Sequence, residues 1–176
     1  MKIKKTLISA EQIEKRVVEL AKQIDEDYKD IKEPLILVGI LKGSFIFLAD
    51  LSRHLTIPHV VDFMSVSSYG HSTTRSGNVR IIMDARENQE GRDVLIVEDI
   101  LDTGHTLDYL IKNFNSRYTK SVRTCVLARK PSRMEFPVEV DYIGFDIPDA
   151  WVVGYGLDFA EQGRTLPDIC EMEQEK

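Results

Sequence analysis

Apolar positions near the amino terminus recur at helical spacing. Ser9 and Gln12 have the spacing of a capping box, in which each side chain bonds the backbone of the other residue. The apolar residues that follow fall on one face of a helix: Ile13, Val17, Leu20, Ile24 and Tyr28. The pattern therefore predicts an amphipathic first helix.

Further along, continuous apolar runs alternate with helical periodicity. The runs 35–40, 59–66, 79–83, 91–99 and 122–127 predict strands, and helical spacing over 45–55 and 107–114 predicts helices. Unbroken apolar strands separated by helices indicate a mostly parallel sheet that is covered on both faces. Ligands of such α/β folds bind beyond the carboxyl ends of the strands. We therefore expect function in 41–44 and 98–106.

Two segments lack these patterns. The polar stretch 67–78 has no apolar period, so we expect an exposed, mobile loop there. From about residue 131 the chain is richer in Pro, Gly and aromatic residues, which favours short strands and turns. We expect one domain over 1–176, in which residues 131–176 and part of the amino terminus form a hood over the strand ends.

Composition narrows the class of protein. The 176 residues are 43% hydrophobic and 30% charged, which is ordinary for one globular domain. No stretch has the length of a membrane span or the form of a signal peptide, so we expect a cytoplasmic protein whose Cys125 and Cys170 are reduced. The formal net charge of -6 argues against nucleic acid as a partner, because such binding needs a basic face. This net charge does not exclude a small anionic ligand, which local amides and a few cations can bind.

The segment 94–106, VLIVEDILDTGHT, carries the strongest chemical signal. Four apolar residues deliver Glu98 and Asp99 to a strand end, where two adjacent carboxylates repel each other unless hydroxyls or Mg²⁺ neutralise them. The following D-T-G-H-T offers a glycine, hydroxyls and free amides at a helix start, which suits a phosphate. Acidic residues that simply cap the next helix are the alternative.

This string resembles the phosphoribosyl pyrophosphate (PRPP) signature of the type I phosphoribosyltransferase family. The resemblance implies an α/β fold with a central, mostly parallel sheet flanked by helices and a small hood built from the terminal segments. It assigns Glu98 and Asp99 to the ribose hydroxyls, with Mg²⁺ nearby. The residues it assigns to the 5′-phosphate loop are Asp102, Thr103, Gly104, His105 and Thr106.

Other segments resemble the hypoxanthine branch of that family. Leu41, Lys42 and Gly43 match its pyrophosphate loop, in which the Lys-Gly peptide bond is often cis, although L-K-G-S is also an ordinary strand-to-helix turn. Ser68 and Tyr69 resemble the Ser-Tyr of its mobile catalytic loop, which would close over the reaction and exclude water. A polar loop without function is the alternative reading of that segment.

Residues of the last third complete the resemblance. Lys130 matches the lysine that donates to a purine 6-oxo group, Trp151 the aromatic that stacks on the base, and Val152 the residue whose backbone reads the base edge. Asp158 matches an acid that helps to hold Mg²⁺, and Arg164 an arginine that reaches the pyrophosphate. Taken singly, these residues would be a solvated lysine, a core tryptophan and surface charges.

The resemblance implies purine salvage, in which a 6-oxopurine displaces pyrophosphate from PRPP with Mg²⁺ present and Asp102 acts as the general base. His105 departs from the lysine or arginine that is usual in the loop, so we expect weaker and pH-dependent phosphate affinity. Ala150 leaves the preference among hypoxanthine, guanine and xanthine open. A transferase for another base, or a PRPP-binding regulator without catalysis, is the rival reading. Family resemblance further suggests a homodimer or homotetramer.

Overall fold

A six-stranded sheet forms the centre of the computed structural model, which describes residues 2–69 and 78–173. The strand order is β4-β3-β2-β5-β6-β7, and all neighbouring pairs are parallel except β3 with β4. The strands are β2 (Leu35–Leu41), β3 (His59–Tyr69), β4 (Asn78–Met83), β5 (Asp93–Leu101), β6 (Ser121–Arg129) and β7 (Tyr142–Asp146). The predicted fold class, α/β with a mostly parallel sheet, is confirmed.

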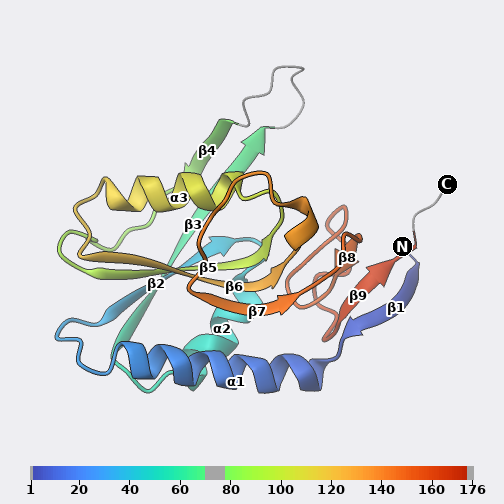
Figure 1. The fold of residues 1–176 in the computed structure, drawn as a ribbon, viewed down its shortest axis with the longest axis horizontal. Helices are drawn as coiled ribbons and strands as arrows, with labels where there is room; N and C mark the ends of the chain where they lie inside the picture. Colours follow the sequence, from blue (N-terminus) through green and yellow to red (C-terminus); the bar gives the residue numbers. More distant parts are fainter. Residues whose placement is uncertain (1, 70–77, 174–176) are drawn as a thin grey trace.

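Helices cover both faces of this sheet. In Figure 1, α1 (Ala10–Asp27) and α2 (Phe45–His54) lie on one side and α3 (His105–Asn115) on the other. Successive residues of β2 divide between the two layers, because Leu35 and Leu37 pack in the α1–α2 core and Ile36 packs in the α3 core. This alternation explains why the central strands read as continuous apolar runs.

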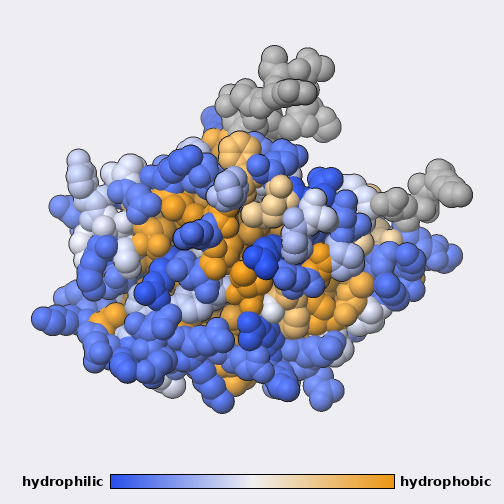
Figure 2. Space-filling view, in the orientation of Figure 1, coloured by the Kyte–Doolittle hydropathy of each residue, from blue (hydrophilic) through white to orange (hydrophobic). Residues whose placement is uncertain are grey.

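The first helix follows its sequence pattern closely. The Ser9 side chain accepts a hydrogen bond from the Gln12 amide, and the Gln12 side chain accepts one from the Ser9 amide. The capping box is therefore confirmed. The predicted apolar face is buried as well, since Ile13, Val17 and Leu20 are at most 1% exposed. In Figure 2, hydrophilic side chains dominate along α1, and apolar ones gather over the strands between α1 and α3.

The two ends of the chain meet in a second, smaller sheet. Its order is β1-β9-β8, from β1 (Ile3–Ile8), β9 (Ile169–Met172) and β8 (Val152–Val153), and both pairings are antiparallel (Figure 1). Most of β1 is exposed, so no apolar run marks it in the sequence. Backbone pairing with β9 creates this strand.

The prediction that everything after residue 131 forms the hood is wrong for β7. This strand pairs in parallel with β6, and Tyr142 is buried in the main core. Between β6 and β7 the structure has only a short 3₁₀ turn, η1 (Pro131–Arg133), and irregular chain, so no crossover helix announces another parallel strand.

The predicted loop over 67–78 starts too early. Backbone pairing with β4 carries β3 on through Ser67, Ser68 and Tyr69, in the register Ser67↔Arg80 and Ser68↔Val79. Polar residues sit in a strand here because an antiparallel partner satisfies their backbone groups whatever their side chains are. The side chains of Ser68 and Tyr69, and residues 70–77, lie outside the described part of the chain.

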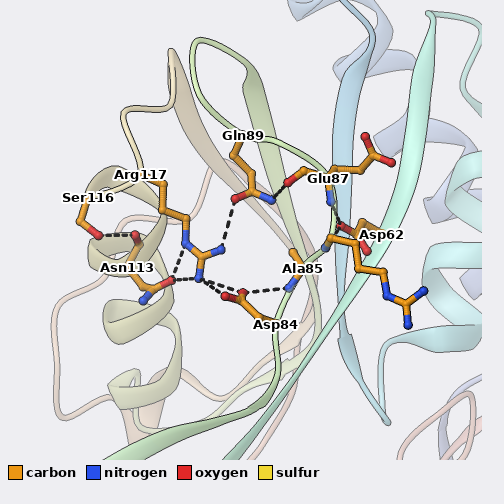
Figure 3. Close-up of polar contacts among 9 residues, drawn as sticks. Asp62, Asp84, Ala85, Glu87, Gln89, Asn113, Ser116 and Arg117 are labelled. Carbon is orange, nitrogen blue, oxygen red and sulfur yellow. Dashed lines mark hydrogen bonds and ion pairs between the residues drawn. The ribbon is translucent and has the colours of Figure 1, made fainter.

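Polar contacts fix the connection between β4 and β5 (Figure 3). The Asp62 carboxylate accepts from the backbone amides of Arg86 and Glu87 at 2.7 and 2.8 Å. Arg117, just past α3, donates to Asp84 and to the Gln89 side chain. This segment is therefore tied both to β3 and to the carboxyl end of α3.

Among the described residues, none of the helices has the length and apolar character of a membrane span.

Candidate active site

A cavity of about 460 Å³ opens at the carboxyl ends of β2 and β5. Its lining joins the turn after β2 to the turn between β5 and α3, and Val66 and Val79 complete one wall. The predicted site residues in this lining are Leu41, Lys42, Gly43, Glu98, Asp99, Asp102, Thr103, Gly104, His105 and Thr106. Parallel pairing of adjacent strands brings these two turns together, as expected for an α/β sheet.

The turn before α3 is shaped for an anion. Gly104 has φ of 93°, and a Cβ at this position would lie 2.8 Å from the Phe136 carbonyl oxygen, so a side chain would be strained there. The carbonyl of Thr103 accepts from the amides of Glu135 and Phe136, both at 3.0 Å, which holds the turn from behind. The first amides of α3 have no partner within the helix, and they open at the cavity.

Glu98 and Asp99 form a desolvated acidic pair. Glu98 is only 5% exposed, and burial raises its pKa to about 8, with a further upward contribution from the Asp99 charge. Burial also raises the pKa of Asp99 to about 6, although backbone hydrogen bonds, including one from Ile100, act in the opposite direction. Such a pair favours a ligand that brings hydroxyl donors or a cation.

Close backbone packing forms the opposite wall. A Cβ at Gly43 would overlap the Asp99 carboxylate, and a Cβ at Gly156 would overlap the Gly43 carbonyl. Glycine at both positions therefore lets the turn after β2 lie against β5 and the turn after β8. The cis peptide bond in this wall joins Leu41 to Lys42, one bond earlier than the Lys42–Gly43 bond that the resemblance suggested.

Two predicted pyrophosphate cations are already paired with carboxylates. Lys42 Nζ lies 3.0 Å and 3.1 Å from the two carboxylate oxygens of Glu161. Arg164 donates to the Gly156 carbonyl at 2.6 Å, and its Nη2 lies 2.6 Å from Asp158 and 3.5 Å from Glu161. The structure thus brings Lys42, Arg164 and Asp158 together. Our sequence analysis missed Glu161, because an exposed glutamate on a turn carries no local signal.

The predicted purine residues lie apart from this cavity. Lys130 is 8% exposed, and its Nζ lies 4.0 Å from Asp149 Oδ1. Trp151 is 57% exposed, with its ring edge-on to Phe159, and it lines a second cavity of about 420 Å³ beside β9. Val152 begins β8. Asp149 lies close to Lys130 and also lines the second cavity with Trp151. It therefore links the predicted 6-oxo lysine to the predicted stacking aromatic.

The surroundings of Asp102 and His105 also escaped the sequence analysis. Arg133 Nε donates to Asp102 Oδ1 at 2.9 Å. His105 lies against the Phe136 ring, with centroids 4.0 Å apart, and its Nε2 is 3.3 Å from Glu135. All three partners, Arg133, Glu135 and Phe136, come from the segment after β6, to which our sequence analysis assigned no contact with the phosphate turn.

Comparisons with known proteins agree with this geometry. The family model described as a phosphoribosyl transferase domain matches residues 5–160, so the chain belongs to that family. A hypoxanthine-guanine phosphoribosyltransferase of Dictyostelium discoideum is 49% identical over 98% of this chain and 97% of its own length. The Bacillus subtilis protein of the same name is 48% identical over 95% of this chain and 92% of its own.

A solved structure is similar over almost the whole chain. The hypoxanthine phosphoribosyl transferase of Trypanosoma cruzi, in a study of how its C-terminal region affects oligomeric state and activity, superposes with a TM-score of 0.93. It is 42% identical, and the match covers 98% of this chain and 93% of the other. The predicted family, fold and type of enzyme are therefore confirmed.

Proposed function

We propose that this chain transfers the phosphoribosyl group of PRPP to hypoxanthine or guanine, giving a nucleoside 5′-monophosphate and pyrophosphate. The observation that carries the proposal is one cavity lined by the acid pair Glu98 and Asp99, by the turn before α3 and by the Lys42–Gly43 turn. These groups suit a ribose, its 5′-phosphate and a diphosphate, respectively. We choose hypoxanthine and guanine as the bases because the relatives are named hypoxanthine-guanine phosphoribosyltransferases.

Bond breaking at the anomeric carbon leads the reaction, by analogy with glycoside chemistry, so positive charge develops on the ribose. Glu98 and Asp99 hold the ribose hydroxyls and lie beside that charge. Lys42 and Arg164 stabilise the departing diphosphate after exchanging their present carboxylate partners for it. In this proposal Ser68 and Tyr69 help to keep water from the sugar.

Asp102 is the proposed general base for the imidazole ring of the purine. It lines the cavity next to the acid pair and at the start of the phosphate turn, and we expect it to reach the base that is joined to the sugar there. Its Oδ1 already accepts a bond from Arg133, so Oδ2 is the oxygen we assign to the purine. Lys130 then donates to the 6-oxo group, Trp151 stacks on the ring and the Val152 backbone reads its edge.

The acidic residues of the cavity fit Mg²⁺ in its usual protein setting. Among the described residues no three Asp, Glu, His or Cys side chains converge as a ready metal site. Mg²⁺ commonly needs only one or two carboxylates together with substrate oxygens and water. Glu98, Asp99 and Asp158 would hold it, and the raised pKa values of Glu98 and Asp99 mark carboxylates that a cation would relieve. When bound, Mg²⁺ would neutralise diphosphate charge.

An ultraviolet assay tests the function directly. The purified chain is mixed with PRPP and Mg²⁺, and each base is added in turn: hypoxanthine, guanine, xanthine, adenine and uracil. We expect turnover with hypoxanthine, guanine or both. Turnover with uracil or adenine alone would contradict the proposed substrate, and conversion of no base would favour the regulatory reading.

Lys130→Ala tests how the base is recognised. In the parent chain the buried Lys130 ammonium finds an acceptor in a 6-oxo group but none in a 6-amino group, so adenine is disfavoured. Lys130→Ala removes this difference, and we expect the hypoxanthine-to-adenine ratio of kcat/KM to fall by about 10- to 100-fold. Lys120→Ala is the control, because Lys120 pairs with Asp93 near the amino ends of β5 and β6. An unchanged ratio in Lys130→Ala would remove Lys130 from base recognition.

The remaining predictions are kept as proposals. A homodimer or homotetramer is expected, and sedimentation of the purified chain would distinguish the two. A cytoplasmic location and small molecules as the only substrates are likewise proposed, with neither nucleic acid nor membrane as a partner.

A further inference from the structure

The segment that follows β6 contacts several parts of the proposed site. Its Lys130 amide donates to the Leu101 carbonyl at 2.9 Å, and the amides of Glu135 and Phe136 donate to the Thr103 carbonyl. The segment is thus bonded to the residue before Asp102 and to the residue after it. Arg133 lies between these two backbone anchors, so its position relative to Asp102 is set by main-chain contacts.

The Arg133 side chain contacts one carboxylate oxygen of Asp102. Nε donates to Asp102 Oδ1 at 2.9 Å, and the same nitrogen lies 3.9 Å from Asp149 Oδ1. Within the described residues the terminal nitrogens of Arg133 donate no hydrogen bond. The arginine therefore orients one carboxylate oxygen of Asp102 and leaves the other for a ligand.

We propose that Arg133 is a positioning residue for the reaction: it holds the Asp102 carboxylate in the orientation that meets the purine ring. The inference rests on the proposed function. A carboxylate on a turn has several rotamers, and only some direct an oxygen at the base. Because Arg133 fixes one rotamer before the substrate binds, the entropic cost of ordering the Asp102 carboxylate is not added to the barrier of the chemical step.

Arg133→Gln keeps a polar side chain but removes the charged donor. We expect kcat to fall by about 10- to 100-fold, since small misplacement of a reacting group costs rate on that scale. The KM for PRPP should stay within about twofold, because PRPP binds through other residues. Arg133→Lys should recover part of kcat, since an ammonium can donate to the same oxygen but lacks the planar guanidinium.

A double-variant cycle separates positioning from a general structural effect. In an Asp102→Asn background, Arg133→Gln should cause no further loss of kcat, because the group it positions has already been replaced. Arg129→Gln is the matched control: Arg129 pairs with Asp146 at 2.7 Å on the neighbouring strand, and neither residue lines the cavity. Its kcat should equal that of the parent chain, and thermal unfolding of all variants should be cooperative.

The outcomes distinguish this inference from the proposed function. A parent chain that converts no base contradicts both. A parent chain that turns over, with unchanged kcat in Arg133→Gln or additive losses in the double variant, contradicts only the role of Arg133. A rise in the KM for PRPP at constant kcat would assign the guanidinium to the diphosphate instead, and would also overturn the inference.

Discussion

The two sides of the cavity hold their charged groups in different ways. On the β5–α3 side, the acid pair is packed into the end of a central strand and the phosphate turn is fixed by backbone contacts. On the opposite side, Lys42 and Arg164 are held by exposed or half-buried carboxylates, Glu161 and Asp158. Ligand binding therefore leaves the first side nearly unchanged, whereas on the second side ion pairs must be exchanged.

This difference has a physical origin. The first amides of α3 have no partner within the helix, and burial raises the pKa values of Glu98 and Asp99, so a ligand meets groups that the fold has desolvated. The lysine and arginine of the other side have partners, and an exposed ion pair such as Lys42–Glu161 contributes little, because solvent screens its charges. A diphosphate that carries more charge than one carboxylate can displace them. We therefore expect the β5–α3 side to fix the geometry of bound PRPP and the ion-paired side to set its affinity.

The largest effect should come from the rigid side. Asp102→Asn removes the proposed base and should lower kcat by about 10²- to 10⁴-fold, with little change in the KM for PRPP. Steady-state kinetics with hypoxanthine measures both constants. Asp146→Asn, which alters another carboxylate bonded by an arginine, is the control. Turnover close to the parent value in Asp102→Asn would end the assignment of Asp102 as base.

The acid pair should also make stability depend on pH. The pKa of Glu98 is about 8 in the folded chain against 4.5 for an ordinary glutamate, so the folded state keeps a proton that the unfolded state has lost. The free energy of unfolding should therefore fall as pH rises from about 4.5 to about 8.

Denaturant unfolding across this pH range, without ligands, provides the measurement. Glu98→Gln removes the titrating group and should flatten the fall, whereas Glu90→Gln, at an exposed position, should leave it as it is. Parallel curves for the parent chain and Glu98→Gln would show that Glu98 is not desolvated in the way the structure indicates.

A smaller effect, with the opposite sign, is expected on the ion-paired side. Glu161→Gln frees Lys42 and relieves part of the competition for Arg164, so the KM for PRPP and the inhibition constant for pyrophosphate should both fall by about two- to fivefold. Glu26→Gln, which breaks the exposed pair with Lys29, is the matched control. Weaker binding in Glu161→Gln would show that this carboxylate assists the diphosphate side.

The smallest effect concerns His105 in the phosphate turn. Its imidazole lies against the Phe136 ring and contacts Glu135, so it helps to hold the turn in place. His105→Gln weakens these contacts and should raise the KM for PRPP by only about two- to threefold, because a single exposed polar contact contributes little. His54→Gln is the control and should leave the KM unchanged. An unchanged KM in His105→Gln would show that the imidazole does not position the turn.

Sequence analysis was most successful where the signal is local. The capping box of α1, the apolar strands and the turn before α3 depend on residues close together in the chain, and each lies where its pattern predicts. The paired acids followed by D-T-G-H-T could be recognised for the same reason. The mostly parallel sheet and the meeting of two turns at one sheet edge followed from the alternation of strands and helices, whereas the order of the strands came only from the structure.

Contacts between distant segments were decided only by the tertiary structure. The strand β1 exists because β9 pairs with it, and Ser67–Tyr69 is a strand because β4 lies beside it. Arg133 meets Asp102, and Glu161 meets Lys42, across 31 and 119 positions of the chain, respectively. A charged residue on a turn has no periodicity that reveals its partner. Its role is fixed only when the backbone brings the two segments together.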